Sequence, residues 1–310
     1  MPIETKERLS KIPIIRNLVF WAQKVTFKRL GGLSLYDILE LYTIGIIQGA
    51  FTNRAAAVAF NFFMAIFPFL LFILNLIPYM PLENFQEDFF KFLSENVPPN
   101  TYDAIYEIIE DIMNNSNKGL LSSGFILAIF LMANGVSSML AGFENSYHVT
   151  ITRSFIRQYL VSLVLGICLS LILLITVALI VITEIFVNMF EYIYFDKVQI
   201  MIWFRYLFVT MMILLCVSVI FKFGSKQFKK TSLFSIGSII STLLIILSSY
   251  GFGIYVLRFA KYNELYGSIG TLLVMMIYIW LNCTILLLGF ELNATIQRLK
   301  SEKSITFNEN

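Results

Sequence analysis

The feature that most constrains this chain is a series of long apolar runs without a charged side chain. The first run, from Ala55 to Ile77, contains 23 residues. As an α-helix it would be about 34 Å long at ~1.5 Å per residue, which is enough to cross a hydrocarbon core of about 30 Å. Because the run begins beyond residue 50 and lacks the short apolar region of a signal peptide, we predict a membrane span.

Five similar runs follow, and most charged residues lie between them. We predict six transmembrane helices, at about residues 55–77, 120–143, 160–186, 202–221, 233–257 and 269–290. Only 14% of the 310 residues are charged, whereas a soluble domain carries about 25%. The chain therefore has too few ionised groups to cover a water-facing surface. The predicted fold class is all-α, a polytopic helical membrane protein.

Lysine and arginine are distributed unevenly over the predicted loops. The segments that hold 17 of them are 1–54, 144–159, 222–231 and 291–310. The alternate segments hold 5 and are 78–118, 187–201 and 258–268. The positive-inside rule then predicts that both termini are cytoplasmic, as an even number of spans requires. The predicted organisation is a cytoplasmic and interfacial segment at 1–54, a transmembrane domain at 55–297 and a cytoplasmic tail at 298–310, in the cytoplasmic membrane.

Two segments outside the spans are predicted to form amphipathic helices at the membrane surface. In residues 1–54, a basic helix that carries Trp21 suits the anionic inner leaflet. The pair Gly31–Gly32 breaks this helix, and Ser34 can cap a second helix that leads into the first span. The outer loop 78–118 holds eight acidic residues interleaved with apolar residues at helical spacing, which predicts two short helices. Their carboxylates either face water or form a vestibule that attracts cations.

Several polar residues lie within or next to the predicted spans, where side chains must face protein or a wet cavity. We call this set the polar seam: Arg54, Asn61, Pro68, Asn134, Asn282, Glu291 and Asn293. Arg54, Asn61 and Pro68 follow one another at intervals of seven residues, so they share one helix face. Asn61 either makes an interhelical hydrogen bond, worth about 0.6–2 kcal/mol, or contacts a substrate. Glu291 either stays hydrated, pairs with Arg54 or titrates as a proton site.

Glu184 and Arg205 lie near the outer ends of the third and fourth predicted spans. Arg205 either extends its charge to the outer interface or pairs with Glu184, and we predict that the two charged groups lie within about 8 Å. The three cysteines fall inside apolar runs without CxxC spacing, so neither a disulfide nor a metal site is expected. No cofactor is expected either.

Three blocks of sequence carry a resemblance to a known family. They are NRAAAVAFNFFMAIFPFLLF, MANGVSSMLAGFENSYHVTITRSFIRQYL and YGSIGTLLVMMIYIWLNCTILLLGFELNA. In order and spacing they resemble the YihY/BrkB family of bacterial inner-membrane proteins, formerly named ribonuclease BN, over residues 35–297. The chain departs from the family pattern at Phe234–Ile236, Ser238, Asn282 and Phe290. The resemblance implies a six-span membrane protein linked to serum resistance and envelope integrity, and discussed as a transporter or exporter of envelope lipids.

Three functions remain to be compared. The polar seam favours a transporter, exporter or lipid-handling protein of the cell envelope, with membrane lipids as partners and a lipid or small amphiphile as substrate. The alternative is a non-transporting membrane scaffold. A ribonuclease would need metal ligands or an acid–base pair, and the single histidine, His148, lies in a loop with Arg153 and Arg157 that positive-inside bias already explains. We therefore expect no enzyme and no nucleic-acid partner, and a homo-oligomer stays open.

Overall fold

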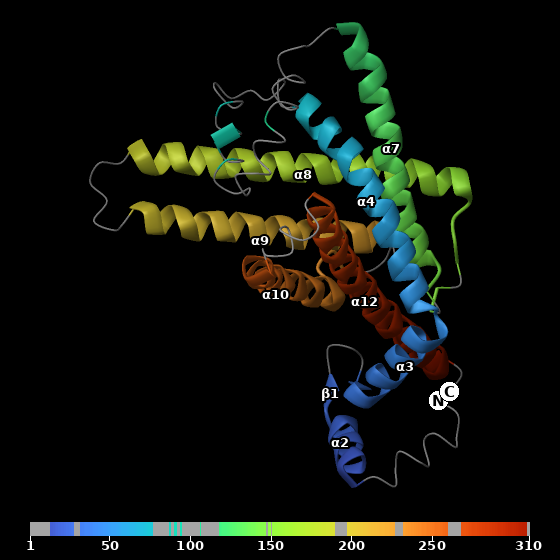
Figure 1. Ribbon diagram of the computed structural model, residues 1–310. Coiled ribbons are helices and arrows are strands. Elements are labelled where there is room, and N and C mark those ends of the chain that lie inside the picture. Colours follow the sequence, from blue (N-terminus) through green and yellow to red (C-terminus); the bar gives the residue numbers. More distant parts are fainter. Residues whose placement is uncertain are drawn as a thin grey trace. The chain divides into compact units, whose positions relative to one another are not determined.

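The computed structural model describes most of the chain as helix (Figure 1). The described residues are 13–27, 32–76, 118–146, 148–149, 151–189, 197–226, 232–259 and 268–308, with the single positions 87, 90, 91, 94 and 106. The all-α fold class is confirmed for these residues, apart from one pair of two-residue strands. The chain divides into two compact units, of which the first contains residues 1–59, 139–153 and 217–310 and the second contains residues 60–138 and 154–216.

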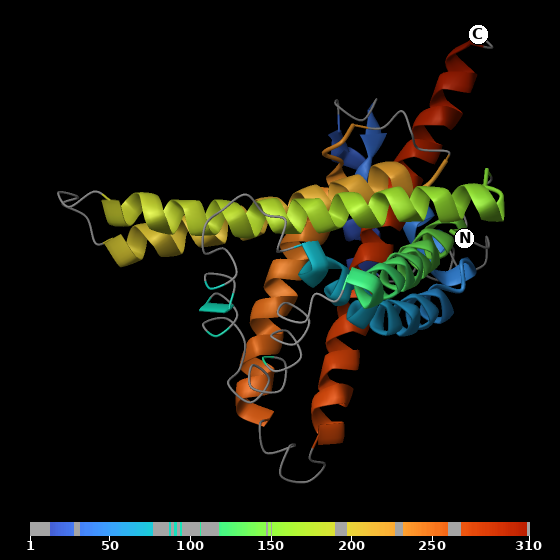
Figure 2. The ribbon, with the colours of Figure 1, turned by 90° about the horizontal axis from the view of Figure 1, so that it is seen from above.

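The second unit is built from long helices that approach one another at small residues. Its elements are most of α4 (Phe51–Leu76), α7 (Lys118–Glu144) and α9 (Lys197–Gly224), and all of α8 (Phe155–Met189). A Cβ atom added to Gly135 of α7 would collide with Ala65 of α4, so these helices can pack this closely only around a glycine. Helices α8 and α9 run alongside each other (Figure 2).

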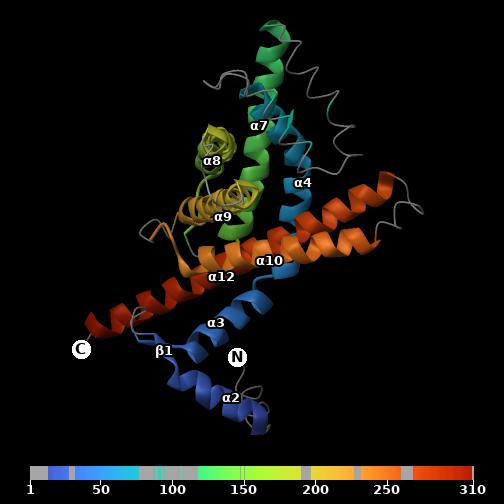
Figure 3. The ribbon, with the colours of Figure 1, turned by 90° about the vertical axis from the view of Figure 1, so that its left-hand side faces the viewer.

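In the first unit, α10 (Ile236–Phe259) and α12 (Ser268–Asn308) form a hairpin of long helices (Figure 3). Asn293 fixes the start of α10, because its Oδ1 accepts a hydrogen bond from the Gly237 N–H at 2.8 Å and its Nδ2 donates to the Ser235 hydroxyl at 2.8 Å. Nearby, a Cβ on Gly289 would collide with the Ser241 hydroxyl. This close approach brings the backbones of the two helices together at one end.

The N-terminal part of the same unit packs against α12. It consists of α2 (Pro13–Lys24), β1 (Thr26–Phe27), β2 (Leu33–Ser34) and α3 (Leu35–Gln48). The predicted cap at Ser34 is confirmed: its hydroxyl accepts from the Asp37 N–H at 3.1 Å, and the Asp37 carboxylate accepts from the Ser34 N–H at 3.3 Å. Leu33 and Ile38 then pack with Ile296 in a small apolar core.

Five helices among the described residues are long and apolar enough to cross a membrane, by length and composition. They are Ile126–Glu144, Phe155–Thr183, Gln199–Gly224, Ile236–Tyr255 and Leu273–Ser301, and each overlaps a predicted span. The first predicted span coincides with α4, whose side chains after Ala65 lie outside the described set. Six spans therefore stay a prediction. Of the outer loop 78–118, the structure describes only residues 87, 90, 91, 94, 106 and 118, so its two predicted helices also stay a prediction.

Two helix ends add detail to the predicted spans. Helix α12 continues past the last predicted span, 269–290, to Asn308, and its extension includes helix formers such as Ala294, Gln297 and Leu299. Its 41 residues correspond to about 61 Å at ~1.5 Å per residue, about twice the thickness of a hydrocarbon core. Helix α3, which the sequence predicts to lead into the first span, ends at Gln48, and Ala50 with its positive φ of 46° separates it from α4.

Candidate functional site, a buried charged cluster

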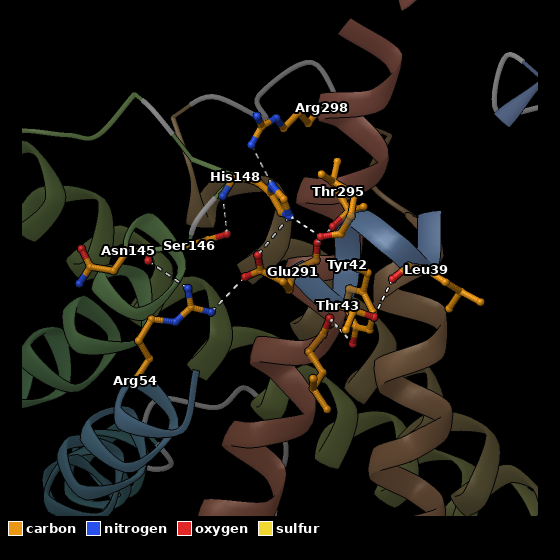
Figure 4. Close-up of polar contacts among 12 residues, drawn as sticks. Leu39, Tyr42, Thr43, Arg54, Asn145, Ser146, His148, Glu291, Thr295 and Arg298 are labelled. Carbon is orange, nitrogen blue, oxygen red and sulfur yellow. Dashed lines mark hydrogen bonds and ion pairs between the residues drawn. The ribbon is translucent and has the colours of Figure 1, made fainter. Parts of the chain in front are cut away.

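One end of the first unit contains a largely buried group of ionisable side chains, which we call the charged cluster: Arg54, His148, Glu291 and Arg298 (Figure 4). Its central contact joins Arg54 Nη2 to Glu291 Oε2 at 3.0 Å. Arg54 is only 8% exposed and Glu291 is 0% exposed. Of the alternatives that the sequence left open for Glu291, hydration is wrong and pairing with Arg54 is confirmed.

Local structure explains why Arg54 needs this partner. Arg54 lies in the first turn of α4, where the positive end of the helix dipole disfavours a cation. Its Nη1 donates to the Asn145 carbonyl at 3.0 Å, and the carboxylate of Glu291 supplies the compensating negative charge. The Arg54 Nε–H and the Glu291 Oε1 atom are buried without a hydrogen-bond partner. Arg54 and Glu291 therefore contact each other, but each keeps one buried polar atom without a hydrogen bond.

His148 forms the other side of the cluster and is 1% exposed. Its Nε2 lies 3.1 Å from the Leu41 carbonyl and 3.7 Å from Glu291 Oε1. Its Nδ1 lies 3.2 Å from Nη1 of Arg298, which follows Glu291 by two turns of α12. The sequence places His148 in a loop between two predicted helices, and no periodic pattern in the chain reveals that such a residue is buried.

Helix α3 closes the cluster with a residue that has no side chain. A Cβ on Gly45 would lie 2.5 Å from Glu291 Oε1 and 2.6 Å from His148 Nε2, so only glycine leaves room for this pair. One turn earlier, Tyr42 donates to the Leu288 carbonyl at 3.3 Å. Burial, followed by the charge of Glu291, raises the pKa of Tyr42 to about 12.

A second buried ion pair lies in the same unit. Arg153 Nη1 contacts Glu144 Oε1 at 2.8 Å, and the Arg153 N–H donates to Glu144 Oε2 at 3.0 Å. The same guanidinium donates to the carbonyls of Gly224 at 3.0 Å and Phe223 at 2.7 Å, at the C-terminal end of α9. A cation is favoured there by the helix dipole. Arg153 is therefore a buried structural residue, in addition to contributing to the positive-inside pattern.

Three phenylalanines pack together beside these ion pairs. The rings of Phe143 and Phe290 stack with centroids 4.3 Å apart, and Phe221 lies edge-on to Phe143 at 5.7 Å. Phe143 precedes Glu144 and Phe290 precedes Glu291, so each buried acid follows a residue of this aromatic group. Phe290, a departure from the family pattern, has a defined packing role here.

The structure separates the other residues of the polar seam. Asn293 bonds to the start of α10, as described above. Asn282 donates to the Tyr278 carbonyl at 2.8 Å within α12, and its Oδ1 is buried without a hydrogen-bond partner. Asn61 and Asn134 belong to the second unit, where both are exposed. The side chain of Pro68 lies outside the described residues. The seam is therefore several local arrangements, of which the charged cluster is the largest.

The predicted outer ion pair stays a prediction. Arg205 is partly exposed on α9, but the side chain of Glu184 is outside the described part of the chain, so the distance between their charged groups is not defined. For metals, the described residues contain no group of three or more His, Cys, Asp or Glu side chains that could hold an ion. The charged cluster offers cationic donors and one carboxylate, which suits proton or anion chemistry.

Contacts in the first unit join helix ends that the sequence predicts to lie on one side of the membrane. Arg54 at the start of α4 contacts the Asn145 carbonyl, Arg153 contacts the end of α9, and Arg298 of α12 contacts His148. That this side is the cytoplasm stays a prediction.

Comparison with known proteins gave a consistent set of relatives. The family described as Virulence factor BrkB matches residues 47–309. The ribonuclease-like protein YfkH of Bacillus subtilis (strain 168) is 30% identical over 271 residues, which cover 86% of this chain and 96% of that protein. A UPF0761 membrane protein of Aggregatibacter aphrophilus (strain NJ8700) is 23% identical over 271 residues, covering 84% of this chain and 92% of the relative. No solved structure matched the chain.

Proposed function

This chain belongs to the virulence factor BrkB family of membrane proteins, and from that premise we propose that it is a transporter or exporter of a lipid or small amphiphile. Its membrane in this proposal is the bacterial cytoplasmic membrane, with residues 1–54 and 298–310 on the cytoplasmic side. Its direct partners are then membrane lipids, and the polar atoms inside the helices serve the passage of a polar headgroup.

The observation that carries this proposal is the incomplete satisfaction of buried polar atoms along α12. Glu291 Oε1 has no hydrogen-bond partner, and neither has Asn282 Oδ1 nine residues earlier. An unsatisfied buried polar atom costs about 1–3 kcal/mol, and polar groups inside a membrane are retained mainly where they serve a function. A purely structural clamp would be expected to satisfy them. These atoms are therefore suited to temporary contacts with a passing polar group.

We also propose that the chain is not a ribonuclease and has no nucleic-acid partner. A general acid or base must lie about 3 Å from the proton that it transfers. The single histidine is 1% exposed, and its ring nitrogens face Leu41, Glu291 and Arg298. This burial argues against His148 as a residue that reaches RNA. The ribonuclease-like name belongs to the Bacillus relative.

The test uses a substitution that separates stability from activity. Asn282→Leu removes a buried amide oxygen without a partner, so the purified variant is expected to be at least as stable as the wild type. If Asn282 is retained for transport, its removal should slow the translocation of a fluorescent phospholipid across proteoliposome membranes by about tenfold, the effect of ~1.4 kcal/mol on a barrier. Arg157→Gln, an exposed change, is the matched control.

Two results would contradict the proposal. Wild-type protein that moves lipid no faster than protein-free vesicles would favour the non-transporting scaffold. Unchanged rates in folded Asn282→Leu, Asn61→Ala and Glu291→Gln variants would show that transport, if present, does not use these polar groups.

A further inference from the structure

We propose that His148 is a proton-binding site, and that its protonation releases Arg298 and with it the cytoplasmic half of α12. The inference deepens the proposed function, on which it rests for its biological role, because it names the proton as the ion coupled to transport. It is argued from the hydrogen-bonding chemistry of four side chains and one carbonyl group.

The two neighbours of the ring determine which nitrogen carries the proton. Arginine has only N–H donors and a carbonyl oxygen is only an acceptor. Nδ1 faces Nη1 of Arg298 at 3.2 Å, so Nδ1 must accept, and Nε2 faces the Leu41 carbonyl at 3.1 Å, so Nε2 must donate. Both contacts are satisfied only by the neutral imidazole with its proton on Nε2. In this state Glu291 Oε1 receives no hydrogen bond.

Protonation makes the Arg298 contact repulsive, whereas Nε2 can still donate to the Leu41 carbonyl. A proton on Nδ1 would face an arginine N–H at 3.2 Å, so two donors and two positive charges would oppose each other. At the same time the imidazolium would be attracted to Glu291 Oε1, which already lies 3.7 Å from Nε2. The attraction persists after Arg298 leaves, whereas the repulsion does not. Uptake of the proton and departure of Arg298 are therefore coupled.

The surrounding charges support the same conclusion. Among the described residues, titratable and charged groups face His148 and Glu291 from three helices: Arg54 from α4, Tyr42 from α3 and Arg298 from α12. With His148 neutral, the cluster holds two arginines and one carboxylate. An added proton would leave a further uncompensated buried charge, which is unfavourable unless a cation moves to water. Arg298 is only partly buried and lies in the extension of α12, so it is the cation that can leave.

Departure of Arg298 would change how elements of the first unit are joined. The Arg298–His148 contact links the extension of α12 to the segment 144–149. The Leu41 contact links the same imidazole to α3, which packs on Ile296 of α12 through Ile38, beside Leu33 of β2. Protonation would break the first link and keep the second, because Nε2 donates in both protonation states. The expected consequence is a looser α12 extension at acid pH.

The single histidine allows a direct test by NMR. Full-length protein labelled with ¹⁵N and ¹³C in the histidine ring and held in lipid nanodiscs should give one imidazole signal set. At high pH it should show the Nε2-protonated tautomer. Arg298→Gln, which keeps a donor but removes the cation, should move the midpoint of protonation to higher pH by about one unit. Glu291→Gln should move it to lower pH by about the same amount.

Lys300→Gln, a neighbouring charge change on α12, is the matched control and should leave the midpoint in place. The proposal is overturned if the Nδ1-protonated tautomer is found, or if Arg298→Gln leaves the midpoint unchanged. A second measurement follows hydrogen exchange of the amides of residues 295–301. After correction for the intrinsic exchange rate, these amides should exchange faster at acid pH in the wild type but not in His148→Gln. The neutral side-chain amide of this variant can accept from Arg298 and donate to the Leu41 carbonyl at either pH. Equal responses would also refute the release of α12.

These measurements do not depend on lipid transport. If the midpoint shifts as stated but no vesicle assay shows translocation, the proton site stands and the proposed function fails. If translocation occurs and is independent of pH and of His148, the proposed function stands and this inference fails.

Discussion

The contact between Arg54 and Glu291 gives the most specific prediction for stability. Replacing Arg54 with Met removes the cation and leaves a carboxylate that is 0% exposed beside a neutral imidazole. The attraction between unit charges at 3.0 Å is about 5–6 kcal/mol for an effective dielectric constant of about 20. Part of this is offset by desolvation, and loss of one partner of such a pair typically costs about 3–5 kcal/mol.

The expected loss for Arg54→Met is therefore about 3–5 kcal/mol of unfolding free energy. Glu291→Gln alone should also destabilise, because it leaves the Arg54 cation buried without a counter-charge. In the double variant neither charge remains, so its loss should be smaller than the sum of the single losses by about 1–3 kcal/mol. Exposed Arg157→Gln serves as the control and should change stability by no more than about 0.5 kcal/mol.

Equilibrium unfolding by sodium dodecyl sulfate in mixed lipid micelles, followed by circular dichroism, provides the four free energies. Additive losses for Arg54→Met and Glu291→Gln would show that the side chains do not interact energetically. A loss below about 1 kcal/mol for Arg54→Met, the range of exposed pairs, would show that the pair is hydrated. Either result would refute the assignment of a buried, mutually dependent pair.

Three further predictions concern the same end of the first unit. Arg153→Met should cost about 3–5 kcal/mol, because Glu144 would stay buried and the carbonyls of Phe223 and Gly224 would lose their donors; Arg157→Gln in the same unfolding assay is again the control. Gly45→Ala should destabilise by about 1–3 kcal/mol, since its Cβ would meet Glu291 and His148, whereas Gly251→Ala, with nothing within 4 Å, should be neutral or stabilising in the same assay. Because the folded state raises the pKa of Tyr42 from 10.0 to about 12, folded protein keeps a proton that unfolded protein releases between these values. Stability should accordingly be unaffected below about pH 10 and fall toward about pH 12, and the difference between wild type and Tyr42→Phe in alkaline unfolding curves should isolate this slope; identical slopes would contradict it.

The sequence by itself determined the class of the protein and the approximate positions of its apolar helices, and it predicts an orientation. These properties follow from local quantities, because a membrane span needs only length and apolarity, and orientation depends on counts of lysine and arginine in loops. The cap at Ser34 is also local, since the Asp37 that completes it lies three residues away. The pairing of Arg54 with Glu291 was accessible because few intramembrane charges were available to pair.

Only the tertiary structure decided which residues share one site. His148 and Arg298 are separated by 150 residues and Arg54 and Glu291 by 237, and no periodicity in the chain relates them. The burial of His148 arises because α3, α12 and the segment 144–149 converge on it, with Gly45 leaving the necessary space. Conversely, Asn61 and Asn134 resembled site residues in sequence but lie on exposed helix faces. Helical spacing specifies the face that a residue occupies, whereas packing alone specifies what that face meets.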